Sequence, residues 1–175
     1  MIKLIDLLEN KILTTRRSPE ERSKNFLIAT QKKIQQYIKD GSKGDLDLGG
    51  TPITSLPQGL RVEGYLDLED TKITTLSQSL TVGGSLYLGN TKITSLPQGL
   101  TVGGYLNLRD TKITFLPQGL TVGGNLNLYG SKITSLPQDL TVGGSLYLTN
   151  TPLSKKYSEE QIKQMVPGVK GEIYI

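Results

Sequence analysis

The chain has 175 residues, with no cysteine, no histidine and a net charge of +4. This composition excludes disulfides, thiol nucleophiles, imidazole bases and the usual zinc ligands. The sequence shows no secretory signal pattern, and no stretch approaches the roughly 20 apolar residues that span a bilayer. We therefore expect a cytoplasmic protein with no membrane segment, no metal site and no cofactor.

The first 43 residues predict a helical cap. Apolar residues among the first 13 indicate a short helix, and Ser18-Pro-Glu-Glu21 is a strong start for a second helix. This second helix should continue to about Asp40 and end at Gly41, because glycine commonly terminates helices. Its expected apolar face consists of Phe26, Leu27, Ile34, Tyr37 and Ile38.

A repeat of 20 residues fills the middle of the chain. The segment from Thr51 to Leu60 recurs with little change as residues 71–80, 91–100, 111–120 and 131–140. Each copy is followed by a pair of turn residues, which is Glu63-Gly64 after the first copy and Gly-Gly after the others, and then by Leu-x-Leu, for example Leu106-Asn-Leu108. The alternating leucines indicate a short strand with both leucines buried, whereas Gly-Gly and Pro-Gln-Gly indicate turns.

Successive copies should stack as coils, with like residues in columns. A single unit buries too little apolar surface to offset the entropy of ordering 20 residues, so neighbouring coils must share one core. The predicted fold is an α+β solenoid of about seven 20-residue coils whose strands form a parallel sheet. Besides the two strand leucines, the interior columns should be those of Ile53, Leu56, Leu60 and Val62.

The C-terminal end predicts a helix and a last strand. Ser158-Glu-Glu-Gln161 begins a short helix that should end before Pro167. Residues 171–175 resemble the strand of a repeat, so the helix should replace the usual return segment. The chain therefore divides into a cap of residues 1–43, a solenoid of residues 44–153 and a cap of residues 154–175, which together form one folded unit.

The repeat resembles the short, 20-residue leucine-rich repeat of bacterial and phage proteins. Residues 106–113, Leu-Asn-Leu-Arg-Asp-Thr-Lys-Ile, are similar to the family's Leu-x-Leu-x-x-Asn-x-Leu core, and Leu116-Pro117 is similar to its Leu-Pro return segment. Threonine or serine replaces the family's asparagine, and glycine replaces the leucine before the strand, which favours a coil flatter than a horseshoe. The resemblance implies a protein-binding module, and a phage protein acting on a host protein such as a defence component.

The positions that vary between the copies indicate a binding face. Outward strand positions, and the residues just beyond the strands, carry side chains other than the valine and threonine that β-propensity alone favours. Tyrosine offers a large contact area at low entropic cost, so we predict that a protein partner binds here. Cross-strand stacking of the tyrosines is the simpler alternative. The predicted contact residues are Tyr65, Asp67, Tyr87, Tyr105, Asn107, Arg109, Asn127, Tyr129, Tyr147 and Tyr174.

A column of lysines offers a second candidate surface. The lysines occupy the same position in four copies, so they should lie along one edge, where they could bind an anion. With the basic residues of the N-terminal cap they give the first alternative, a nucleic-acid or polyanion binder. A solvated surface is the simpler explanation of both groups. The residues concerned are Lys72, Lys92, Lys112 and Lys132, with Arg16, Arg17, Arg22, Lys24, Lys32 and Lys33.

Signals of catalysis are weak, so we expect a non-catalytic protein. Gly83-Gly84 lacks the Lys-Ser/Thr that follows the glycines of a phosphate-binding loop. The second alternative, a carboxylate-based hydrolase, depends on a group of acids that could hold a cation or act as an acid/base pair. This group consists of Asp45, Asp47, Asp67, Glu69 and Asp70.

Overall fold

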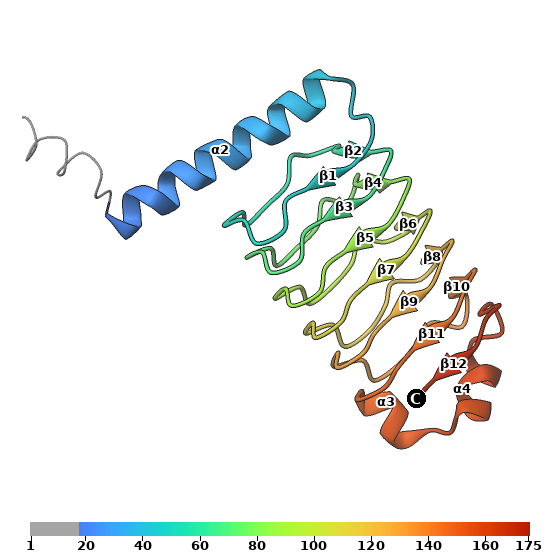
Figure 1. Cartoon of the computed structure of the whole chain (residues 1–175). Helices are drawn as coiled ribbons and strands as arrows, with labels where there is room; N and C mark the ends of the chain where they lie inside the picture. The colour runs from blue at the N-terminus through green and yellow to red at the C-terminus, as the bar shows by residue number, and fades with distance from the viewer. Residues whose placement is uncertain (1–17) are drawn as a thin grey trace, which may run out of the picture.

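The computed structural model describes residues 18–175, and the helix expected among the first 13 residues lies outside this range. Helix α2 (Pro19–Lys39) leads into coils that follow one another along a nearly straight axis, and two short helices lie at the C-terminal end (Figure 1). The chain is a parallel β-solenoid with helical elements at both ends, which confirms the predicted fold class.

One side of the solenoid is a seven-stranded parallel sheet in the order β1-β3-β5-β7-β9-β11-β12. Each strand pairs in register with that of the next coil, so Leu66, Leu86 and Leu106 are direct neighbours. The seven predicted rungs are therefore present. The strands are β1 (Leu46–Asp47), β3 (Leu66–Asp67), β5 (Leu86–Tyr87), β7 (Leu106–Asn107), β9 (Leu126–Asn127), β11 (Leu146–Tyr147) and β12 (Ile173–Tyr174).

A second side is a five-stranded parallel sheet, which the sequence analysis did not predict. Its strands are the two residues before each turn pair, in which valine is buried and the preceding residue faces outward. Two residues are too few to show an alternating pattern, so only the valine column was recognised. The strands are β2 (Arg61–Val62), β4 (Thr81–Val82), β6 (Thr101–Val102), β8 (Thr121–Val122) and β10 (Thr141–Val142).

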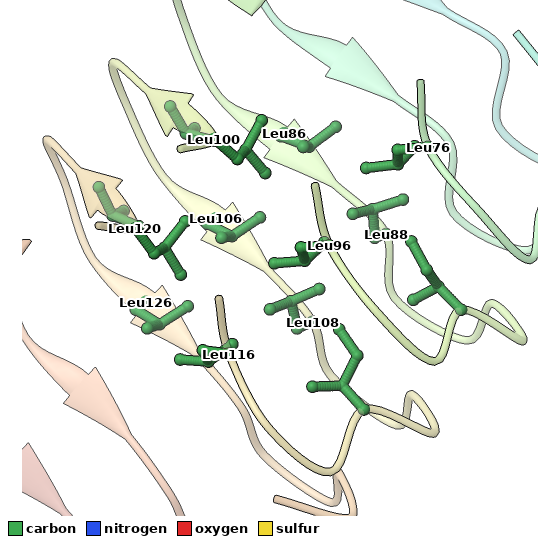
Figure 2. Packing of buried hydrophobic residues seen from close by; sticks show 14 of the residues in the cluster. Leu76, Leu86, Leu88, Leu96, Leu100, Leu106, Leu108, Leu116, Leu120 and Leu126 are labelled. Carbon is green, nitrogen blue, oxygen red and sulfur yellow. The ribbon is translucent and has the colours of Figure 1, made fainter. Parts of the chain in front are cut away.

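The core is one continuous stack of leucine, isoleucine and valine. Figure 2 shows Leu86, Leu106 and Leu126 one above another, and all three are fully buried. The core extends to Ile34 of α2 at one end and to Ile162 at the other, so both caps cover apolar side chains that the terminal coils would otherwise expose. Two expected core residues, Leu56 and Leu136, are only partly buried.

The Gly-Gly pairs allow the coils to approach closely. A Cβ atom on Gly103 would lie 1.9 Å from the Gly83 carbonyl oxygen, well inside the contact distance. The second glycine of the pair, Gly104, donates its N–H to the Gly84 carbonyl at 2.9 Å. These glycines were predicted as turn residues, but their main role is to let the backbones of neighbouring coils meet.

The turn after each Leu-x-Leu strand requires a left-handed backbone. Its second residue has φ +56° at Asp70, +58° at Asn90, +55° at Asp110 and +63° at Asn150. Aspartate and asparagine tolerate this conformation better than other residues with a Cβ atom. The left-handed turn therefore explains why aspartate occurs at positions 70 and 110.

Buried hydroxyls follow this turn. Thr71, Thr91 and Thr111 each donate to the carbonyl of the leucine three residues earlier, at 2.7, 2.7 and 2.8 Å. This confirms that the hydroxyl can serve the turn backbone where the leucine-rich repeat has asparagine. The Ser131 hydroxyl, in the same column, is buried without a hydrogen-bond partner among residues 18–175.

Helix α2 has the predicted ends but a narrower contact stripe. Ser18 and Glu21 form the expected capping box, and Asp40 is the C-cap residue. Ile34 is buried and Leu27 and Tyr37 are partly buried. Phe26 and Ile38 are 49% and 39% exposed, so their assignment to the packed face was wrong. The reason is that a helix crossing the end of one coil buries only a thin stripe.

The C-terminal cap contains one more helix than predicted. Helix α4 (Glu159–Met165) starts at Ser158 as expected, but α3 (Pro152–Lys156) was missed, although Thr151 caps it and proline follows at its first position. Strand β12 pairs Ile173 with Leu146, which confirms that the last strand belongs to the sheet.

We expect Gly103→Ala to destabilise the fold by about 1–3 kcal/mol or more, because the new methyl group overlaps the neighbouring backbone. Urea unfolding measures the change. Thr101→Ala, at an exposed position two residues earlier, is the control and should cost less than about 1 kcal/mol. Equal losses for both variants would contradict the close-approach explanation.

We expect Ser131→Ala to be neutral or stabilising, since it removes a buried hydroxyl without a partner. Thr91→Val should instead cost about 0.5–1.5 kcal/mol, because it deletes the hydrogen bond to the Leu88 carbonyl. Thermal unfolding of the two variants checks this difference in sign. A loss for Ser131→Ala as large as that for Thr91→Val would show that the serine hydroxyl is satisfied in solution.

Candidate interaction site

The outward side of the seven-stranded sheet, with the residues directly before and after its strands, is called the strand face. All ten predicted contact residues lie on it, because parallel pairing in register puts equivalent positions in columns. The middle column, formed by the residue between the two leucines or by its equivalent in β12, consists of Asp47, Asp67, Tyr87, Asn107, Asn127, Tyr147 and Tyr174.

Three tyrosines of neighbouring coils form an aromatic cluster. The ring centroids of Tyr65 and Tyr87 are 6.1 Å apart and those of Tyr87 and Tyr105 are 5.7 Å apart, both with edge-to-face geometry. Burial raises the pKa of Tyr105, and a hydrogen bond with Asn127 partly offsets this rise. The cluster is fixed by ring contacts, yet Tyr65 is still 36% exposed and open to a partner.

A second aromatic group lies over the later coils. The rings of Tyr147 and Tyr174 are stacked, with centroids 4.7 Å apart. The guanidinium carbon of Arg109 lies 5.3 Å from the centroid of the Tyr129 ring, and the Tyr129 hydroxyl accepts a 2.7 Å hydrogen bond from Asn150. Stacked and edge-on rings cost little further entropy on binding, so both groups are preorganised.

Arg109 is the one basic residue among the predicted contacts. Its Nε donates to Asp110 at 2.9 Å, and this bond raises the pKa of Arg109. The side chain remains 59% exposed. Beside it is a hollow of about 300 Å³ lined by Arg109, Asn127, Tyr129, Tyr147 and Thr149. This volume is at the small end of the range for ligand pockets.

Several polar residues of the strand face also stabilise the backbone. Asp67, Asn107 and Asn127 each accept the N–H of the residue two positions later, at 2.9, 3.1 and 2.9 Å. In the column before the strands, the side chains of Asp45 and Asn125 accept the N–H of the equivalent residue in the next coil. Asp67, Asn107 and Asn127 were predicted as contact residues and Asp45 as one of a group of acids, and this structural role was not predicted for any of them.

The acidic residues lie at the N-terminal end of the strand face. The carboxylates of Asp47 and Asp67 accept the N–H groups of Gly49 and Glu69, so both stabilise the turn that follows their strand. Glu69 reaches two coils along and accepts a hydrogen bond from the Asn107 amide. Burial and the Asp67 carboxylate raise the pKa of Glu69, although the Asn107 bond opposes this. Within residues 18–175, no group of three or more acids is arranged to hold a metal ion.

The lysine column lies on the third side of the coils. Lys72, Lys92, Lys112 and Lys132 are exposed. The Lys72 N–H donates to the Ile53 carbonyl, and Thr134 donates to the Thr114 carbonyl, so the coils are also linked here. None of the four lysines forms an ion pair in the described part of the chain. Lys24, Lys32 and Lys33 are exposed on α2, whereas Arg16 and Arg17 lie outside the described residues.

A groove between α2 and the first coil was not predicted. Its volume is about 510 Å³, and Leu27, Gln31 and Ile34 of the helix line it together with Pro52 and Leu56. The only sequence signal was Pro52, which stands where the other copies have lysine. Without knowledge of how the helix crosses the coil, this substitution did not indicate a groove.

No known protein family and no curated protein matches the chain in sequence. Among the described residues, no helix has the length and apolarity needed to cross a membrane. On these observations the chain is a repeat protein built from parallel stacked coils of about 20 residues.

We expect Glu69→Gln to raise the unfolding temperature slightly at pH 7 and to leave it unchanged at pH 3. The raised pKa means that ionised Glu69 is disfavoured in the folded state, and this penalty disappears once the carboxyl is protonated at low pH. Glutamine retains an acceptor for Asn107. Thermal unfolding at both pH values checks the prediction, and a destabilised variant at pH 7 would contradict it.

Proposed function

We propose that the protein is a non-catalytic binding module that recognises a protein partner through the strand face. The supporting observation is the set of preorganised aromatic and arginine side chains on one sheet. Tyrosine and arginine are enriched among the residues that contribute most to protein–protein binding energy. Rings that already contact one another lose little entropy when a partner binds.

The length of the face also suits a protein partner. Seven strands at about 4.8 Å spacing give a surface roughly 29 Å long. The Arg109 hollow provides one recess in this surface, which fits a single protruding side chain. Cross-strand stacking accounts for the ring contacts, but it does not account for Arg109 or for this recess.

The repeat sequence supports a more specific proposal about the type of repeat and the biological setting of the protein. Leu106-Asn-Leu108 and Leu116-Pro117 support a relationship to the short bacterial leucine-rich repeats, and this relationship supports a phage protein that acts on a host protein in the cytoplasm. This step is an argument by analogy, because a fold alone does not define a function.

A second candidate function is polyanion binding along the lysine column. Four exposed ammonium groups follow one another in consecutive coils, and in residues 18–175 none is neutralised by an ion pair. Such binding would weaken steeply with added salt, because each neutralised phosphate releases counterions. A tyrosine-centred protein interface would be far less sensitive to salt.

One crosslinking experiment separates the two candidates. A photoreactive phenylalanine analogue is introduced in bacterial cells in place of Tyr105 on the strand face, Thr101 on the second sheet or Thr94 near the lysine column. We expect a protein adduct from position 105. Adding Tyr87→Ala and Tyr147→Ala should reduce this adduct about tenfold, as expected for the loss of central aromatic contacts.

The other two positions serve as controls, because they lie on the remaining sides of the same stack. Nucleic-acid adducts from position 94 would favour the second candidate. Equal protein adducts from all three positions, or an adduct from position 105 that the alanine substitutions leave unchanged, would contradict the proposed strand-face site.

A further inference from the structure

The negative charge of the first coils exceeds what their backbone contacts need. Asp67 makes the same hydrogen bond to the residue two positions later that Asn107 and Asn127 make in later coils. Asp45 likewise makes the inter-coil bond that Asn125 makes. Because asparagine supplies the same oxygen acceptor without charge, the fold requires the oxygen and not the carboxylate.

Within the described part of the chain, these carboxylates also lack ion-pair partners. In residues 18–175, none of Asp45, Asp47 and Asp67 forms an ion pair within 4.0 Å. Lys33 of α2 approaches Asp47, but it donates to the main-chain carbonyl oxygen rather than to the carboxylate. The Lys33 ammonium group therefore does not form an ion pair with the Asp47 carboxylate.

The acidic group and the aromatic cluster form a single surface. Tyr65 occupies the position in the second coil that Asp45 occupies in the first, and its N–H donates to the Asp45 carboxylate. Asp67 pairs in register with Tyr87. Desolvation and the carboxylates of Asp45, Asp47 and Asp67 raise the pKa of Tyr65, in agreement with negative charge that is not neutralised around its ring. Aromatic faces and carboxylates both attract guanidinium and ammonium groups.

We propose that the first three coils of the strand face bind a cationic, extended segment of the protein partner, with arginine or lysine side chains against Tyr65 and Tyr87 and beside the carboxylates of Asp45, Asp47 and Asp67. This inference rests on the proposed function and names the chemistry of the partner. Charge complementarity selects a basic occupant, because an acidic segment would meet unpaired carboxylates here.

The net charge of the whole chain does not favour a cationic segment, so the attraction must come from the acidic part of the strand face. A net charge of +4 repels a cationic segment at long range, so binding must come from the surface where the carboxylates lie. The asparagines at the same positions of later coils provide no such charge, which places the basic residues over β1, β3 and β5.

A labelled peptide of alternating serine and arginine tests the inference, because alternation puts the arginines on one side of an extended chain. Fluorescence anisotropy with the full-length protein should show binding of this peptide and none of the matching serine–glutamate peptide. The triple variant Asp45→Asn, Asp47→Asn, Asp67→Asn should bind the arginine peptide about tenfold more weakly. Its unfolding temperature should not change, since the backbone hydrogen bonds remain.

A charge-matched control separates local from overall effects. Asp139→Asn, Glu159→Gln and Glu160→Gln remove three negative charges away from the strand face and should leave the affinity unchanged. Tyr87→Phe should retain binding and Tyr87→Leu should weaken it, because only the first keeps an aromatic face. No binding of the arginine peptide, or equal weakening by the two triple variants, would overturn the inference.

The two proposals can fail separately. If position 105 crosslinks to a protein but the arginine peptide does not bind, the strand face recognises its partner by other chemistry and the proposed function stands. If position 105 gives no protein adduct, the proposed function fails whatever the peptide does.

Discussion

The contact between successive coil backbones is the constraint on which the rest of the structure depends. Gly104 hydrogen-bonds to Gly84 one coil away, and Gly103 lies so close to Gly83 that no side chain fits between them. This approach fixes the register, and a slip of one residue would turn every strand leucine outward. Stacking therefore determines both the leucine core and the outward columns from which any surface must be built.

Positions that face outward can carry more residue types than the buried columns, but the backbone conformation still limits which residues fit. The turn after each strand needs a left-handed residue and, in several coils, a side-chain acceptor for a free N–H group, and aspartate and asparagine meet both needs. Asp67 and Asn107 supply the same oxygen acceptor to this turn, although only Asp67 carries a charge and only Asn107 also donates a hydrogen bond, to Glu69. Comparing equivalent positions in different coils thus shows which side-chain features the fold requires, here an oxygen acceptor, and which it does not, here the negative charge.

The repeat made most of the fold predictable. Period and alternation identified the leucine columns and the seven-stranded sheet, and capping residues gave the ends of α2 and α4. The second sheet was missed because two-residue strands have no pattern, and the exposure of Phe26 was missed because it depends on how α2 crosses the first coil. The sequence predicted that Tyr87 and Tyr105 lie on one face. It did not predict the contact between their rings, because that contact depends on side-chain rotamers.

The distribution of side chains on the strand face fits a polypeptide better than a regular polymer. Coils repeat about every 4.8 Å, whereas side chains on one side of an extended peptide repeat about every 6.6 Å, so the two come into phase only every third or fourth coil. A regular polymer that makes the same contact with every coil would match a column in which each coil carries the same residue, as in the lysine column. The tyrosines of the middle column instead occur at β5 and again at β11 and β12, with Asn107 and Asn127 between them. In this column, tyrosines on either side of two polar coils suit the extended partner segment that we propose.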